Sequence, residues 1–137
     1  MESLLHINRA EMFVAQGMWD EAKAACDLAY DIATQRGDRL REAEALKFRG
    51  IVARERGHRE DSVRQLSQAL ELASDGEDTL LRAEILRELG RTWAHEGTLP
   101  EARSAFKEAV VLFRKLNATL DAADVRARLD QLEETAA

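Results

Sequence analysis

Residues 86–113 read LRELGRTWAHEGTLPEARSAFKEAVVLF, and they are the clearest copy of a pattern that the chain repeats every 40 residues. The repeat is marked by glycines at Gly17, Gly57 and Gly97. A period of this size indicates stacked copies of one small unit rather than a single large core. Stacked units of this kind present a surface to a partner more often than they enclose a pocket for chemistry.

The composition indicates one globular domain that is nearly all helix. The chain has 137 residues, of which 45% are apolar and 34% charged. This length is enough to bury a core without disulfides or metals. Alanine, leucine, glutamate and arginine are abundant good helix formers, and there is a single proline. We therefore expect residues 1–137 to form a single all-α domain.

Charge and cysteine content narrow the classes of partner. The net charge of −6 would repel phosphate backbones, so nucleic acid is not an expected partner. No apolar run reaches the ~18 residues of a membrane span, and the polar residues after Leu4 and Leu5 do not fit a signal peptide. Cys26 is the single cysteine, which excludes an internal disulfide and fits a reducing compartment. These features predict a cytoplasmic protein with no membrane partner.

Apolar spacing predicts seven helices, two in each copy of the repeat and one after the last copy. The copies span residues 2–38, 39–78 and 79–118, and their helices cover residues 2–16, 20–35, 39–56, 60–73, 79–96 and 100–116. Breaks are expected at Gly17, at residues 37–38 and at residues 75–78. The seventh helix, residues 120–134, reads as half of a fourth copy with a polar outer face, which the end of a solenoid needs for solubility.

Small and bulky residues recur in fixed columns around each marker glycine. Small residues stand seven positions before the glycine, at Ala10, Gly50 and Gly90, and five after it, at Ala22, Ser62 and Ala102. Alanine stands twelve positions after it, at Ala29, Ala69 and Ala109. Larger residues mostly stand nine positions after it, at Cys26, Leu66 and Phe106. This pattern resembles the tetratricopeptide repeat over nearly the whole chain. The family's terminal proline is absent from every copy, and the period of 40 exceeds the common ~34 residues. The longer repeat is similar to those of large bacterial signalling ATPases and regulators and of some eukaryotic adaptor proteins.

The resemblance implies a right-handed α-solenoid of three helix–turn–helix repeats and a capping helix. The first helix of each pair would line a concave groove that binds a peptide or helix of a partner. Carried over to this sequence, the groove residues are Lys47, Phe48, Ile51, Arg54, Glu84, Arg87, Glu88, Arg91, His95 and Arg128. The family's chaperone-type carboxylate clamp is absent, because Ile7 and Glu11 stand where it needs Lys and Asn.

The cationic groove residues allow two interpretations. Lys47, Arg54, Arg87, Arg91 and Arg128 could form a basic strip that accepts an acidic peptide or a C-terminal carboxylate, because Arg offers bidentate contacts. Alternatively, the same residues pair with neighbouring acids as a solvated face, since their helical spacing suits such pairs. The acids in question are Glu44, Glu84, Glu88 and Asp124.

An apolar group at the N-terminus also has more than one interpretation. Leu4, Leu5 and Ile7, with Phe48 and Ile51, form a candidate patch that could dock an amphipathic helix or a second copy of the chain. The same residues could equally be ordinary core packing under the second helix.

The sequence does not indicate an enzyme, a metal site or a cofactor. The three histidines, His6, His58 and His95, lie on different copies without the convergent spacing that a metal needs. Cys26 falls in a core column, and no histidine is placed to activate it. We therefore expect a protein-binding scaffold or adaptor, within bacterial signalling or regulation. The alternatives are a self-assembling module that dimerises through its N-terminal apolar surface and a peptide-sensing regulatory domain.

Overall fold

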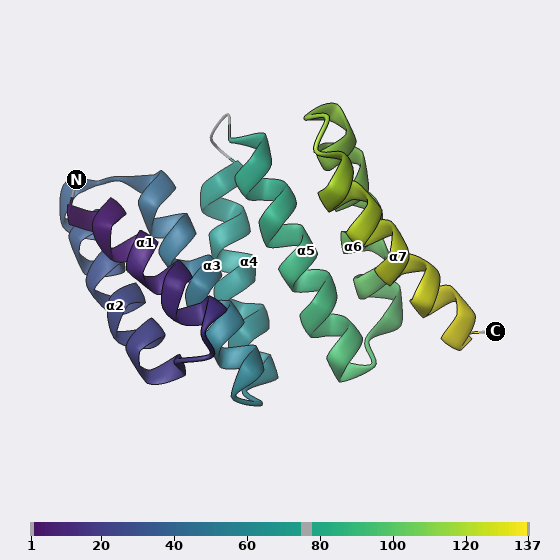
Figure 1. Ribbon diagram of the computed structural model, residues 1–137, viewed down its shortest axis with the longest axis horizontal. Helices are drawn as coiled ribbons and strands as arrows, with labels where there is room; N and C mark the ends of the chain where they lie inside the picture. Colours follow the sequence, from purple (N-terminus) through teal and green to yellow (C-terminus); the bar gives the residue numbers. More distant parts are fainter. Residues whose placement is uncertain (1, 75–77, 137) are drawn as a thin grey trace. The chain divides into compact units, whose positions relative to one another are not determined.

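The computed structural model describes residues 2–74 and 78–136, and these residues form seven α-helices and no strand (Figure 1). The helices are α1 (Glu2–Ala15), α2 (Trp19–Arg36), α3 (Arg39–Glu55), α4 (Arg59–Ser74), α5 (Thr79–Glu96), α6 (Leu99–Lys115) and α7 (Thr119–Ala136). The prediction of an all-α fold built from helical repeats is confirmed. The expected break at residues 75–78 falls largely outside the described residues.

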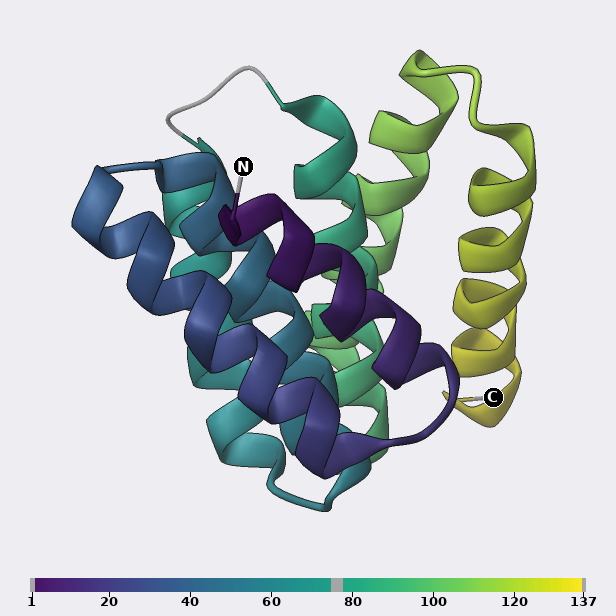
Figure 2. The ribbon, with the colours of Figure 1, turned by 60° about the vertical axis from the view of Figure 1, so that its left-hand side comes forward.

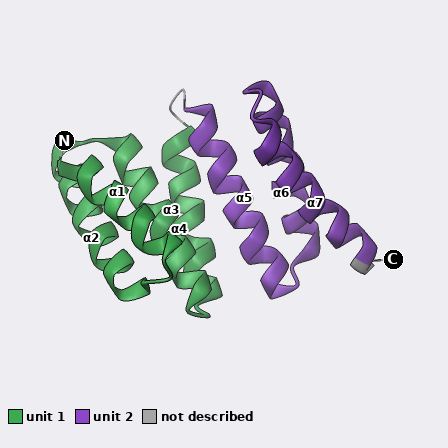
Figure 3. Cartoon of the chain, in the orientation of Figure 1, with its two compact units in different colours: residues 1–76 green, residues 77–137 purple. Residues whose placement is uncertain are grey.

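The chain divides into two compact units, Met1–Gly76 and Glu77–Ala137 (Figure 3). In the first unit α1 packs on α2, α2 on α3 and α3 on α4, and α1 also contacts α3. Figure 2 shows α1 and α2 as one antiparallel pair. In the second unit α5 packs on α6, and α6 packs on α7. The expectation of a single domain over residues 1–137 stays a prediction.

The turns inside the helix pairs follow from a few local residues. Gly17 and Gly97 have φ values of 70° and 81°, in the left-handed region that favours glycine. The N–H of Gly97 donates to the carbonyl of Ala94, at 3.2 Å, and so closes the end of α5. At the start of α5, the carboxylate of Asp78 accepts a hydrogen bond from the N–H of Leu81, at 2.8 Å. Helix α5 is therefore capped at its start by Asp78 and at its end by Gly97.

The recurring columns of small and large residues are packing partners. A Cβ added at Gly50 would lie 2.5 Å from Cγ of Leu66, and one at Gly90 would lie 2.5 Å from Cδ1 of Phe106. Because real Cβ atoms do not approach so closely, α3 meets α4, and α5 meets α6, through a glycine. In the first copy, Ala10 shares a buried cluster with the small Cys26.

Cys26 is fully buried, as its core column predicts, and its thiol is difficult to ionise. Burial, with a smaller contribution from Asp27, raises the pKa of the thiol from 9.0 to about 12. The unfolded chain therefore loses this proton at a lower pH than the native protein, so stability falls as pH rises above 9. Between pH 8 and pH 10 we expect wild type to lose about 1 kcal/mol more than Cys26→Ala in urea unfolding. Equal losses in the two proteins would contradict this assignment.

Candidate functional site

The predicted groove residues divide between the two units. In the first unit they lie on α3, and they are Lys47, Phe48, Ile51 and Arg54. In the second unit α5 carries most of them and α7 carries one, and they are Glu84, Arg87, Glu88, Arg91, His95 and Arg128.

The α3 residues are mostly buried. Lys47, Phe48 and Arg54 are each at most 8% exposed, and Ile51 is half-buried. The Lys47 ammonium lies 4.4 Å from the centre of the Phe48 ring, a cation–π contact. Phe48 belongs to the same core cluster as Ile7, and Ile51 packs against this cluster. Phe48 therefore stabilises the first unit rather than offering an open surface to a partner.

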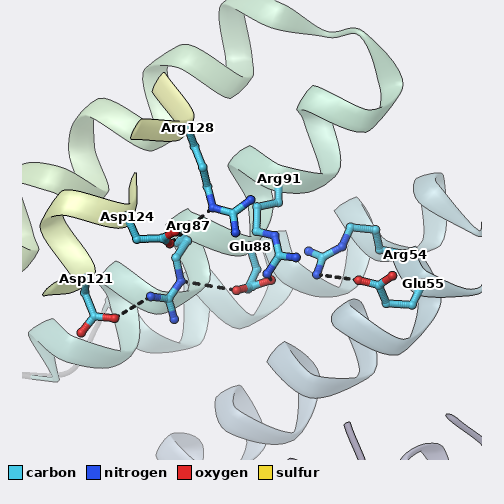
Figure 4. A network of polar contacts seen from close by, with 8 residues as sticks. All are labelled: Arg54, Glu55, Arg87, Glu88, Arg91, Asp121, Asp124 and Arg128. Carbon is cyan, nitrogen blue, oxygen red and sulfur yellow. Dashed lines mark hydrogen bonds and ion pairs between the residues drawn. The ribbon is translucent and has the colours of Figure 1, made fainter. Parts of the chain in front are cut away.

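In the second unit, three arginines and three carboxylates form what we call the α5–α7 network (Figure 4). Its members are Arg87, Glu88, Arg91, Asp121, Asp124 and Arg128. Nη1 of Arg91 donates to Oε1 of Glu88, at 3.3 Å, and Nε of Arg87 lies 3.5 Å from Oε2 of the same carboxylate. Glu88 is only 5% exposed, so this carboxylate is held by guanidinium groups away from water.

Arg87 connects α5 to both other helices of its unit. Its Nη1 donates to Oδ1 of Asp121 on α7, at 2.8 Å, and its guanidinium lies 5.2 Å from the centre of the Phe113 ring on α6. On α7, Nε of Arg128 donates to Oδ2 of Asp124, at 3.3 Å, across one helical turn. The network therefore fixes the direction of the Arg87 side chain from two sides.

The charges of the α5–α7 network balance, because it holds as many carboxylates as guanidinium groups. Pairing of the arginines with Glu88 and Asp124 follows the second of the two sequence-based interpretations. Asp121 was not among the expected partners. It lies 34 residues from Arg87 and no repeat column marks it, so no local sequence signal could have found this contact.

The N-terminal apolar patch is smaller than the sequence suggested. Ile7 is 2% exposed and packs in the core cluster of the first unit, because the stripe of Ile7 and Ala10 faces inward from α1. Leu4 is half-buried, and Leu5 is 56% exposed. The correction is that Ile7 is a core residue, and only Leu5 of the three presents a large apolar surface.

Within the described ranges, no three His, Cys, Asp or Glu side chains gather in a way that could hold a metal ion. Likewise, no helix in the described part of the chain has the length and apolar character that a membrane crossing requires.

Known proteins resemble this chain in sequence pattern and in fold. Two sequence models of the tetratricopeptide repeat match it, one over residues 1–75 and the other over residues 49–118. No curated protein matches it. Among solved structures, aspartyl phosphate phosphatase F from Bacillus subtilis superimposes with a TM-score of 0.76 at 14% identity, over 98% of this chain and 40% of that one.

Two further structures show the same fold. BtubC from P. vanneervenii has a TM-score of 0.69 at 14% identity, over 97% of this chain and 63% of that one. The C-terminal TPR-containing domain of an FK506-binding protein from Plasmodium falciparum has a TM-score of 0.64 at 13% identity, over 97% of this chain and 91% of that domain. The chain thus spans less than two thirds of the first two proteins, and these likenesses identify an all-α solenoid of helical repeats.

Proposed function

This chain belongs to the tetratricopeptide repeat family, and on that premise we propose that it is a module that binds a peptide or helix of a partner protein on the first helices of its repeats. Members of this family are generally non-catalytic scaffolds for protein interaction. In the second unit the proposed surface is the exposed face of α5, completed by α7 through the α5–α7 network.

The observation that carries the proposal is the arrangement of Arg87 and Arg91 on either side of the buried Glu88. Their side chains are 20% and 29% exposed, so each side chain is held by protein contacts and remains partly open to solvent. A guanidinium presents its N–H donors in a planar fork that matches a carboxylate, and a held side chain loses less entropy on binding. Two such groups one helical turn apart suit a partner segment that offers carboxylate or carbonyl oxygens.

We also propose that the module acts as an adaptor in bacterial signalling and lies in the cytoplasm. The structural likeness to aspartyl phosphate phosphatase F, a protein of Bacillus subtilis, supports the bacterial part of this proposal, and the chain spans 40% of that protein.

A pull-down from a lysate of the source organism, read by mass spectrometry, tests the proposal. The variant Arg87→Gln/Glu88→Gln/Arg91→Gln removes the charges around Glu88 together, so that no carboxylate is left buried beside missing guanidinium groups. The matched control is Lys107→Gln/Glu108→Gln/Arg114→Gln, which makes the same net change on exposed positions of α6. We expect a stoichiometric partner that the control retains and the network variant loses.

Two outcomes would contradict the proposal. A partner retained equally by both variants would mean that the α5–α7 network is not the binding surface. Recovery of this chain alone would favour self-association, which light scattering at several protein concentrations would then measure.

A further inference from the structure

A second candidate site lies within the first unit, on residues that the proposed function does not use. A pocket of about 420 Å³ is lined by α2, α3 and α4, and by Arg56 and His58 of the turn between α3 and α4. We call it the α2–α4 pocket. It shares no lining residue with the α5–α7 network or with the predicted groove residues of α3. Its volume falls in the range of sites that hold small molecules or a few residues of a peptide.

The pocket gathers positive charge on a protein whose net charge is −6. Its cations are Lys23, Arg49, Arg56 and Arg64, and among the described lining residues Asp61 is the one carboxylate. A second carboxylate, Asp27, is shared, because it accepts from Nζ of Lys23 at 2.8 Å and from Nε of Arg49 at 2.7 Å. The cations therefore outnumber the carboxylates that hold them.

The inner part of the pocket is fixed by the contacts of Arg49. Partial burial alone would raise the pKa of Asp27, but the hydrogen bonds from Lys23 and Arg49 outweigh it and lower that pKa below its usual value of 3.8. The Arg49 guanidinium also lies 4.6 Å from the centre of the Tyr30 ring. These contacts hold Arg49 and Tyr30 in place as one wall of the pocket.

The outer cations are held by weaker, exchangeable pairs. Arg56 pairs with Asp20, whose side chain is 87% exposed. Arg64 pairs with Asp61, and the Arg64 side chain is 75% exposed. Exposed ion pairs contribute little to stability, so an incoming carboxylate can replace Asp20 or Asp61 at a small cost. The mouth of the pocket is thus able to accept an anion without disturbing the pairs of Asp27.

The remaining lining sets the size and chemistry of the occupant. Leu46, Val52 and Ala53 of α3 are 2%, 3% and 6% exposed and close the inner side of the pocket, so the half-buried Tyr30 supplies its accessible apolar surface. The lining runs from Lys23 to Tyr30 along α2, which at 1.5 Å per residue is about 10 Å, the length of about three extended residues.

We propose that the α2–α4 pocket binds a short acidic segment of a partner protein, in which a carboxylate pairs with Arg56 and Arg64 and a neighbouring apolar side chain packs against Tyr30. The positive charge of the pocket favours binding of the carboxylate, and the length of the pocket and the Tyr30 ring favour a peptide segment over an isolated small anion.

Fluorescence anisotropy with a labelled peptide, Glu-Leu-Glu-Leu-Glu, acetylated and amidated at its ends, tests this assignment. We expect Arg56→Gln/Arg64→Gln to raise the Kd by about tenfold or more, because charge-assisted hydrogen bonds are lost. The matched control, Arg36→Gln/Arg59→Gln, removes two exposed arginines of the same unit that do not line the pocket, and it should bind as wild type does. The peptide Gln-Leu-Gln-Leu-Gln should not bind.

Several results would overturn the assignment. These are equal loss of binding in the pocket and control variants, equal affinity for the Gln peptide, or no binding at millimolar peptide. Displacement of the probe by N-acetylglutamate at concentrations comparable to those of the peptide would mean that the pocket takes a small carboxylate instead. The network variant Arg87→Gln/Glu88→Gln/Arg91→Gln should bind the probe with wild-type affinity, which separates this test from that of the proposed function.

Discussion

Replacing Phe106 with alanine should lower the free energy of unfolding by about 3–5 kcal/mol, one of the largest effects expected of any single substitution in this chain. Phe106 is 1% exposed, and its ring lies directly over Gly90, where it closes the contact between α5 and α6. Its removal loses the burial of the ring and leaves a cavity that the two helices can fill only in part. Urea unfolding followed by circular dichroism measures the loss.

The effect of Gly90→Ala on the free energy of unfolding should change sign with the residue at position 106. In wild type the new Cβ would lie 2.5 Å from the Phe106 ring, so overpacking of about 1–3 kcal/mol should exceed the helix-propensity gain of about 1 kcal/mol. In the Phe106→Ala background the ring is gone, and the same substitution should stabilise the protein. A double-mutant cycle measures this coupling. If Gly90→Ala had the same effect in both backgrounds, the close approach of the ring would not determine the choice of glycine.

This coupling explains why the fold could be predicted from the sequence. A small residue and its partner sixteen positions later form one contact in the second and third copies, Gly50 with Leu66 and Gly90 with Phe106. The largest partner faces a glycine, whereas the small Cys26 shares a cluster with Ala10. Packing partners of this kind recur in the same columns of the repeat. The recurring columns of small and large residues therefore predict which helices contact each other, as well as where the helices lie.

The candidate site was less accessible to sequence reasoning, for a physical reason. Long charged side chains take partners from any helix within reach, and repeat columns do not record those choices. Glu88 and Asp124 could be expected as partners because they lie within one turn of an arginine. The contact between Arg87 and Asp121 depends on how α5, α6 and α7 pack, and Ile7 shows the same dependence for an apolar residue.

The α2–α4 pocket lay beyond sequence reasoning for a related reason. It combines residues of two copies of the repeat. The period indicates which residues of the copies are equivalent, but it does not predict which residues of α2 and α4 lie close together beside α3. Its cations are not in equivalent columns: Lys23 stands six residues after Gly17 and Arg64 seven after Gly57. Such a site is found only when the packing within the first unit is known.

Neutralising both arginines beside Glu88 should destabilise the protein far more than their partial exposure suggests. In Arg87→Gln/Arg91→Gln, the Glu88 carboxylate remains 95% buried and loses two guanidinium partners, and removing a charged partner from a buried ion pair costs about 3–5 kcal/mol. Adding Glu88→Gln should restore most of this loss, because a neutral amide is easier to bury than a carboxylate. Urea unfolding of the double and triple variants measures both changes.

Lys107→Gln/Arg114→Gln provides the control, since it removes two exposed cations of the same unit and should change stability by no more than about 0.5 kcal/mol at each site. A double variant as stable as this control would show that Glu88 does not depend on the two arginines. The rescue also decides how the binding experiment is interpreted. A triple variant that is stable and still loses its partner has lost a binding contact, because its folding no longer depends on the arginines, whereas loss of the partner in the double variant alone would reflect the folding of α5.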